Sequence, residues 1–363
     1  MHRADFCMTG AFRDLFLFRH VKMLQALLLL VTATALASYL GRRYGFITDF
    51  PYPLFGAAAP TNVIGGILFG IGMVLCGSCV VGTLYRLGAG SKLAAVALFG
   101  LIFGSALYAE IHPWWKSLVV TKPWRADIIT LPQALHLPEE IFLVLLTAAT
   151  CTIVYRRKAP ASTARTFLPA GHMTPYQAAL LLALIGIVSV MATGMPLGIT
   201  TAYAKVAAQV EYLLWPAHVE ATAFFQALPL DYVAPLGKVH LSGGAGPAFD
   251  GIAAIQYPLL IGITGGAAFS ALLLNEWRLT PWPPRRQLLG AFIGGIIMAL
   301  GSRITPGCNI WHLWGGLPIF ALQSLLFLVG LLPGAWLGGL LLTRFVLTAT
   351  VPMKGVAHEH SNL

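Results

Sequence analysis

The sequence predicts an all-α polytopic membrane protein with about eight or nine transmembrane helices and additional short re-entrant half-helices. Of its 363 residues, 57% are hydrophobic and only 10% are Asp, Glu, Lys or Arg, whereas a soluble protein carries about 25% charged residues. The mean hydropathy is +0.77. This composition excludes a soluble globular enzyme as the default, and it excludes disorder, which needs low hydrophobicity and high net charge. Residues 1–363 are expected to form a single membrane domain.

Long charge-poor runs support this fold class. A spanning helix needs about 20 apolar residues to cross about 30 Å of hydrocarbon. Eight runs meet or nearly meet this length: residues 23–41, 50–85, 93–109, 141–155, 173–204, 251–275, 287–302 and 304–343. Several are too long for one helix and are interrupted by Gly or Pro, so we expect eight or nine crossings. The segment before them mixes polar and aromatic residues and is not expected to be a cleavable signal peptide.

The basic residues predict how these helices are oriented. Two short connections hold basic clusters, namely Arg156, Arg157, Lys158 and Arg165 in one and Arg278, Arg285 and Arg286 in the other. Short loops rich in Lys and Arg stay in the cytoplasm, so both clusters are predicted there. The mixed-charge loops 110–140 and 228–250 are predicted on the opposite side, over a pore mouth. This bias accounts for the net charge of +10, and no basic stretch with interleaved aromatic residues indicates nucleic-acid binding.

An internal repeat is the main organisational signal. A Gly-Gly-Ile motif followed by Gly and Cys occurs twice at a constant offset of 229 positions, as Gly65-Gly66-Ile67, Gly72 and Cys79 and as Gly294-Gly295-Ile296, Gly301 and Cys308. A second, weaker match aligns residues 7–12 with residues 198–203 at an offset of 191. We therefore predict a first half at residues 1–158 and a second half at residues 173–350, with an insertion near residues 220–258.

Each repeated unit is a long apolar helix that ends at Gly or Pro, followed by a tight turn and a short helical run. Helices broken in this way persist in lipid only where they line a cavity, and paired interruptions in two halves indicate a transport site. Close packing by small residues is the simpler explanation of the glycines. It does not explain a rare residue, Cys, at the same place in both units.

These motifs resemble the YeeE/YedE family of membrane proteins. The resemblance spans nearly the whole chain and rests on residues 6–14, on Cys79-x-x-Gly82-x-x-Tyr85-Arg86-x-Gly88-x-Gly90, on Met195-Pro196-Leu197-Gly198-Ile199-Thr200 and on Gly307-Cys308-Asn309-Ile310. It implies uptake of thiosulfate or a related sulfur or selenium compound through a bacterial inner membrane, with no enzymatic activity and no cofactor. Some family members act beside, or fused to, a sulfur-carrier protein of the TusA type, which is therefore an implied partner.

The resemblance also implies a cysteine relay between four short inward helices, at Cys7, Cys79 and Cys308. Cys76 is also expected on the substrate path. It departs from the family pattern and creates a Cys-x-x-Cys sequence, which would alter the solute or add redox sensitivity. The expected supporting residues flank these cysteines and the related unit near residue 200: Gly77, Ser78, Gly82, Arg86, Gly198, Thr200, Thr201, Lys205, Gly307 and Asn309. Cys151 lies in no motif and is expected to be a buried apolar residue.

Thiosulfate is a dianion, and unpaired charge in a low-dielectric medium costs tens of kcal/mol by idealised estimates. One helix N-terminus returns only about 0.3–2 kcal/mol, and one charge-assisted hydrogen bond returns about 1.5–3 kcal/mol. Several converging N-termini are therefore needed for affinity. Thiols are weak donors and acceptors, so we expect them to select the terminal sulfur of thiosulfate over all-oxygen sulfate.

The positions of charged residues near the broken helices have two interpretations. Arg13, Arg86 and Arg303 fit either the solute path or a position where the side chain reaches the membrane interface. Lys205 lies among apolar residues just after Gly198-Ile199-Thr200 and is expected to attract an anion. His312 has no further ligand near it in sequence, so no metal site is predicted.

Two other functions compete with transport. A membrane thiol-disulfide oxidoreductase would use Cys76 and Cys79, because Cys-x-x-Cys motifs lower thiol pKa values at helix N-termini. Such an enzyme normally needs a second cysteine pair facing the other compartment. A membrane anchor for a sulfur-carrier protein is the other alternative.

Overall fold

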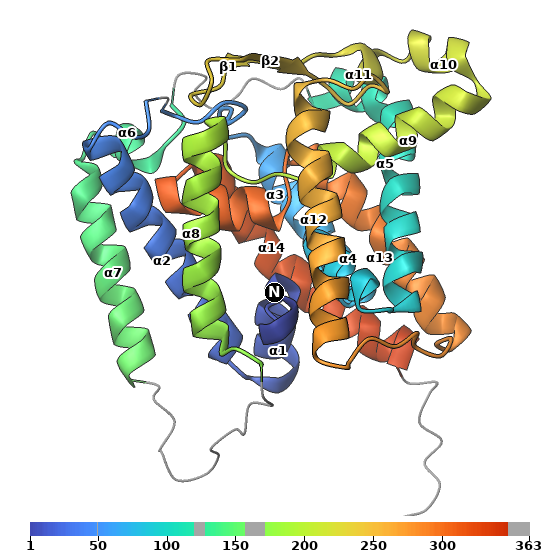
Figure 1. The fold of residues 1–363 in the computed structure, drawn as a ribbon, viewed down its shortest axis with the longest axis horizontal. Helices are drawn as coiled ribbons and strands as arrows, with labels where there is room; N and C mark the ends of the chain where they lie inside the picture. Colours follow the sequence, from blue (N-terminus) through green and yellow to red (C-terminus); the bar gives the residue numbers. More distant parts are fainter. Residues whose placement is uncertain (49, 120–127, 157–170, 348–363) are drawn as a thin grey trace, which may run out of the picture.

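The computed structural model describes residues 1–48, 50–119, 128–156 and 171–347, which are almost wholly helical (Figure 1). The elements up to residue 156 are η1 (His2–Ala4), α1 (Met8–Phe18), α2 (Lys22–Arg43), α3 (Pro60–Cys76), α4 (Val80–Gly88), α5 (Lys92–Val119), α6 (Leu131–Leu135) and α7 (Glu139–Arg156). The later elements are α8 (Pro175–Thr193), α9 (Thr200–Leu214), α10 (Pro216–Ala221), α11 (Ala223–Gln226), β1 (Leu230–Val233), β2 (His240–Gly243), α12 (Gly251–Leu273), α13 (Arg285–Ile304), η2 (Ile310–Gly316), η3 (Leu317–Ile319), α14 (Leu322–Leu341) and η4 (Leu342–Leu347).

The predicted fold class, an all-α polytopic membrane protein, is confirmed. Seven helices in the described ranges are long and apolar enough to cross a membrane, and they begin at Lys22, Pro60, Lys92, Pro175, Gly251, Arg285 and Leu322. This number is lower than the predicted eight or nine for two reasons. α7 has 18 residues that include two glutamates in its first turn, and the run 304–343 contains the π-helical η2 and the 3-10 turn η3 before α14.

The two ends of the molecule differ in the way the loop charges predict. The connection between α12 and α13, which contains Arg278 in sequence, and the start of α13 lie at one end, together with the C-terminal end of α7 (Figure 1). We call this the basic end. The antiparallel hairpin β1–β2 lies at the opposite end with α6, α10 and α11, and we call this the hairpin end. Arg157, Lys158 and Arg165 are outside the described residues. The segment with α10, α11 and the hairpin overlaps the region where the insertion is predicted.

Local signals in the sequence set several helix boundaries. Thr174 begins α8 by accepting a hydrogen bond from Gln177 N at 3.3 Å, with Pro175 in the first turn. Asp250 begins α12 by accepting one from Ala253 N at 3.0 Å. Gly77 ends α3 with φ of 76°, a left-handed conformation that glycine adopts at little cost. This turn separates α3 from α4 at the predicted break.

Four glycines bring α3 and α13 into direct backbone contact. A Cβ at Gly65 would stand 2.8 Å from the Gly301 carbonyl, and a Cβ at Gly301 would stand 2.8 Å from the Gly65 carbonyl. The pair Gly72 and Gly294 is reciprocal in the same way, at 2.6 Å and 2.8 Å. The first glycine of each predicted unit therefore meets the last glycine of the other unit.

The neighbouring helices extend this reciprocal arrangement. Gly66 of α3 packs against α14 at Gly330, whereas Gly295 of α13 packs against α5 at Gly100. Since α5 follows α3–α4 and α14 follows α13–η2, equivalent partners surround the two units. These contacts support the two-half organisation, which stays a prediction here, and they fix where α3 and α13 end.

We predict that Gly72→Ala destabilises the fold. The new Cβ would lie 2.5 Å from Met298 N, and backbone cannot move aside without opening the α3–α13 contact. Overpacking of this kind typically costs about 1–3 kcal/mol. Thermal unfolding of the detergent-purified variant should show a lower midpoint. Gly262→Ala on α12 is the matched control, since its Cβ would meet no atom within 4 Å. Equal midpoints for the two variants would contradict this packing.

Candidate solute path

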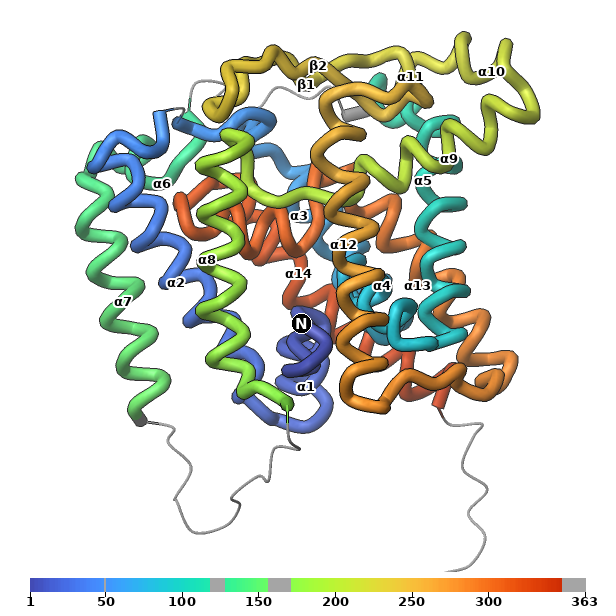
Figure 2. Tube along the Cα trace, viewed as in Figure 1, coloured from blue at the N-terminus to red at the C-terminus, as the bar shows by residue number. Residues whose placement is uncertain are grey.

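Short helices begin in the interior of the protein at the predicted cysteines. Cys7 is the N-cap residue of α1 and Cys79 is the N-cap residue of α4. α9 begins after Ile199, a buried residue of the same hydrophobic cluster that contains both cysteines. Figures 1 and 2 show α1 running toward the basic end and α9 running toward the hairpin end. Helices from both ends therefore begin in one buried region.

Cys7 and Cys79 are direct neighbours. The thiols of Cys7 and Cys79 interact with each other, and Cys79 Sγ accepts a hydrogen bond from Gly82 N at 3.3 Å. A Cβ on Gly82 would lie 3.2 Å from Cys7 Sγ and 3.5 Å from Cys79 Sγ. The missing side chain at Gly82 thus leaves the space where the two sulfurs meet.

Cys308 lies next in this series. Cys79 interacts electrostatically with Cys308, and the fully buried Tyr203 interacts with both sulfurs. The Tyr203 hydroxyl donates to the Val80 carbonyl at 3.4 Å. The three predicted cysteines are only 1–3% exposed. Tyr203 was not among the predicted site residues, although its alignment with Phe12 across the predicted repeat is a signal that could have found it.

Cys76 is close to the series but belongs to a separate polar group. Its thiol hydrogen-bonds to Thr83 and Ser78, and the Ser78 and Thr83 hydroxyls are 2.9 Å apart. All five cysteines of the chain are free thiols, and Cys151 on α7 is exposed rather than buried. The expectation that Cys151 is a buried apolar residue is therefore wrong, because its helix face is not covered by another described element.

A cavity of about 600 Å³ lies toward the hairpin end, and its lining includes the residue that precedes Cys308. Its lining includes Gly198, Thr200 and Thr201 at the start of α9 and Gly307 immediately before Cys308. Gly307 has φ of 153°, and a Cβ there would lie 2.4 Å from the Trp311 ring. Glycine is therefore required at this turn in the lining of the cavity.

Arg303 is one of the cationic residues that line this cavity. Its guanidinium donates to the Thr200 carbonyl and to Thr201 Oγ1, and it interacts electrostatically with Cys308. Its buried Nε has no hydrogen-bond partner. Lys116 also lines the cavity, and none of the described lining residues is acidic. The cavity is therefore suited to an anion.

Lys205 lies elsewhere, although it was predicted to attract the anion. Its fully buried ammonium donates to the carbonyls of Gly246 and Ala248 and to Asp250 Oδ2, each at 2.8 Å. It is not among the residues that line the cavity. Because all three protons are used, this side chain holds α9 to the start of α12 near the hairpin.

The remaining predicted residues differ in their surroundings. Arg86 donates to the Gly77 carbonyl at 2.8 Å and interacts electrostatically with Cys7. Arg13 pairs with its own neighbour Asp14 at 2.8 Å. Asn309 is 1% exposed, and its Oδ1 has no partner.

His312 is a scaffold residue. Its Nδ1 lies 3.0 Å from Ser324 Oγ, and its Nε2 lies 3.0 Å from the Thr305 carbonyl. The ring stacks on Phe327 at 4.3 Å. These contacts link η2 to α14 and account for a buried histidine without a metal ion.

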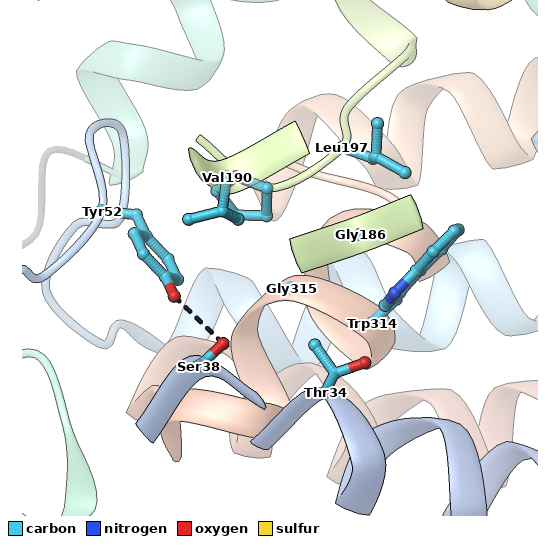
Figure 3. A pocket seen from close by; sticks show the side chains of 9 residues that line it. Thr34, Ser38, Tyr52, Gly186, Val190, Leu197, Trp314 and Gly315 are labelled. Atoms are coloured by element: carbon cyan, nitrogen blue, oxygen red, sulfur yellow. Dashed lines mark hydrogen bonds between the residues drawn. The ribbon is translucent and has the colours of Figure 1, made fainter. Parts of the chain in front are cut away.

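A second, much smaller cavity lies between α2, α8 and η2 (Figure 3). Thr34, Ser38, Tyr52 and Trp314 face it, and the Tyr52 hydroxyl donates to Ser38 Oγ at 3.2 Å. Its volume is about 10 Å³, about that of a single water probe. It is too small for a sulfur oxyanion, so the candidate path is the larger cavity.

One cluster of metal-ligand residue types occurs in the described part of the chain, at the hairpin end. The ligand atoms of Glu110, Glu211 and His218 lie within 4.8 Å of one another. His218 Nε2 is 2.7 Å from Glu110 Oε1, and this carboxylate raises the pKa of His218. The ion pair links α5 to α10 and explains the cluster without a metal ion.

Apolar spanning helices around a cavity that ends on interior helix termini define the class of membrane transport proteins. The chain belongs to the sulphur transport family, whose model matches residues 3–337, and this confirms the resemblance to YeeE/YedE proteins. It is 27% identical over 345 residues to the thiosulfate transporter TsuA of Spirochaeta thermophila, covering 93% of both chains. It is 25% identical over 362 residues to TsuA of Escherichia coli, covering 93% of this chain and 89% of that one. Both relatives are named as thiosulfate transporters.

We predict that Lys205→Met lowers stability more than it changes solute affinity. Removing one partner of a buried ion pair typically costs about 3–5 kcal/mol, and here it would leave Asp250 and two carbonyls without their donor. The midpoint of thermal unfolding should fall, whereas the KM of the surviving protein should stay within about twofold, an approximate limit consistent with a site outside the path. A large rise in KM at unchanged stability would place Lys205 in the path instead.

Proposed function

We propose that this protein is a thiosulfate transporter of a bacterial inner membrane, in which the anion passes Cys308, Cys79 and Cys7 in turn. The observation that supports the proposal is a set of neighbouring groups in the protein interior. Gly307 and Arg303 line the cavity, Cys308 follows Gly307 and interacts with Arg303 and Cys79, Cys79 interacts with Cys7, and Cys7 interacts with Arg86. The names of the TsuA relatives support thiosulfate as the solute.

The arrangement divides affinity and selection between different groups. Arg303 and the N-termini of α1, α4 and α9 favour negative charge, and charge-assisted hydrogen bonds from them offset part of the desolvation cost. The thiols add little affinity because sulfur is a weak donor and acceptor. Three soft sulfur sites in succession instead favour a solute with a terminal sulfur, and weak successive sites allow flux rather than trapping.

The direction of transport follows from the loop charges. Short connections rich in Arg and Lys remain in the cytoplasm, and Arg278, Arg285 and Arg286 lie at the basic end. The cavity then opens on the outer side and the solute leaves near Arg86. A sulfur carrier of the TusA type would receive it at the basic end.

We predict that Cys79→Ala or Cys308→Ala reduces thiosulfate uptake by more than tenfold, because each removes one sulfur site from an obligatory series. Uptake of radiolabelled thiosulfate is measured in proteoliposomes that contain only this protein, which also separates a transporter from a carrier anchor. Cys151→Ala, on the exposed face of α7, is the matched control. Normal uptake by the Cys79→Ala protein would remove the thiol from the mechanism.

The same assay separates transport from thiol-disulfide exchange. Cys76→Ala should keep most of the uptake, since Cys76 lies beside the polar pair formed by Ser78 and Thr83. A turnover that requires a Cys76–Cys79 disulfide would instead support the oxidoreductase alternative.

We predict that Arg303→Gln raises the KM for thiosulfate by about tenfold or more, since a charge-assisted hydrogen bond is worth about 1.5–3 kcal/mol and about 1.4 kcal/mol corresponds to tenfold. Arg13→Gln is the control, because Arg13 pairs with Asp14 at the surface of α1. The KM is read from initial uptake rates at several thiosulfate concentrations. An unchanged KM in Arg303→Gln would exclude this guanidinium from solute capture.

A further inference from the structure

A carboxylate lies against the cation at the inner end of the cysteine series. Asp5 precedes Cys7 by two residues, and its Oδ1 accepts a hydrogen bond from the Tyr85 hydroxyl at 2.9 Å. The same oxygen is 3.8 Å from Arg86 Nη2. Asp5 itself is 78% exposed, Arg86 is 31% exposed and Cys7 is 3% exposed. The groups therefore run from solvent to the buried sulfur in the order Asp5, Arg86, Cys7.

Arg86 has one edge fixed and one edge turned toward Asp5. Nη1 donates to the Gly77 carbonyl at 2.8 Å, where α3 ends, whereas Nη2 is the atom nearest to Asp5. The guanidinium interacts electrostatically with the sulfurs of Cys7 and Cys76. An anion that has reached Cys7 thus meets a cation whose free edge is already beside a carboxylate.

The two ends of the proposed path differ in whether a carboxylate lies beside the arginine. At the hairpin end, Arg303 lies beside Cys308 in a cavity whose described lining has no acidic residue. At the other end, Arg86 lies beside Cys7 and faces Asp5. The first arrangement favours capture of an anion. The second gives the cation an internal competitor, which favours release.

The segment that carries Asp5 crosses the basic end and is held by few bonds. η1 contains no buried residue. The Arg3 carbonyl accepts from Met173 N at 3.0 Å, and the side chains of His2 and Arg3 lie 3.2–3.3 Å from Ser270 Oγ on α12. The N-terminus is marked over α1, between α8 and α12 (Figure 1). Asp5 adopts a left-handed φ of 41°, which a non-glycine residue rarely adopts.

We propose that Asp5 is a tethered counter-anion that closes the inner end of the path by occupying Arg86, and that the outgoing anion displaces it. This inference rests on the proposed function. A solvent-exposed ion pair is weak, so a dianion at Cys7 exchanges with Asp5 readily. When the solute leaves, Asp5 returns to Arg86 and Tyr85, and the path is closed again. Exchange between adjacent weak sites is the condition that permits flux.

The test measures access to Cys7 and does not depend on transport. Cys7 is kept as the reactive thiol in a protein with Cys76, Cys79, Cys151 and Cys308 replaced by Ser. The rate of modification by an anionic methanethiosulfonate applied at the basic end is compared between this protein and its Asp5→Asn variant, which keeps an acceptor for Tyr85 but removes the charge. We expect at least a fivefold faster rate in Asp5→Asn. Asp14→Asn, at a carboxylate that pairs with Arg13, should leave the rate unchanged.

A neutral methanethiosulfonate distinguishes charge from packing. Its rate should change less than twofold in Asp5→Asn, and the unfolding midpoint should match that of the parent. Equal acceleration of both reagents, or no acceleration of the anionic one, overturns the proposal. If uptake still requires Cys79 while the anionic reagent is not accelerated, only the role of Asp5 fails. If Cys79→Ala transports normally, the proposed function fails independently of the labelling result.

Discussion

The close backbone contact between α3 and α13 is the constraint on which the rest of the structure depends. Gly65 and Gly72 meet Gly301 and Gly294 reciprocally, at distances that no Cβ could occupy. α3 ends at Cys76, four residues after Gly72, and α13 ends at Ile304, three residues after Gly301. The two chain breaks therefore lie in the same interior region, and the Cys that follows each break is carried there. Small residues at a helix interface let backbones approach in this way.

Electrostatics then decides what this interior region can hold. A buried anion is stable only when fixed donors replace its water, and the start of α9, the guanidinium of Arg303 and the helix ends at Cys7 and Cys79 supply such donors. Lys205, which is more deeply buried than either arginine, does not add to them because Asp250 and two carbonyls already use its protons. The proposed function therefore assigns affinity to the ends of the path and selection to the sulfurs between those ends.

Sequence patterns predicted the parts of the fold and of the candidate site that depend on local chemistry. Long apolar runs predicted the spanning helices, and the recurrence of Gly, Gly and Cys predicted where α3 and α13 break. The same patterns could not predict contacts between side chains far apart in the chain. The pairing of Lys205 with Asp250 and the bond from Arg303 to Thr200 join residues 45 and 103 positions apart. The compact π-helical turn at η2 was also missed, because hydropathy does not distinguish it from a regular helix and so inflated the number of crossings. Asp5 was not predicted as a site residue, because only the folded structure shows that this carboxylate lies beside Arg86.

The most direct test of the proposed path is whether thiosulfate protects its cysteines from alkylation. Single-cysteine proteins retaining Cys7, Cys79, Cys308 or Cys151 would be alkylated in the presence of thiosulfate or of sulfate at equal ionic strength. Thiosulfate should slow alkylation of Cys7, Cys79 and Cys308, sulfate should do so much less, and Cys151 should be unaffected. Equal protection by both anions, or protection of none of the three buried thiols, would contradict a path in which sulfur sites select the solute.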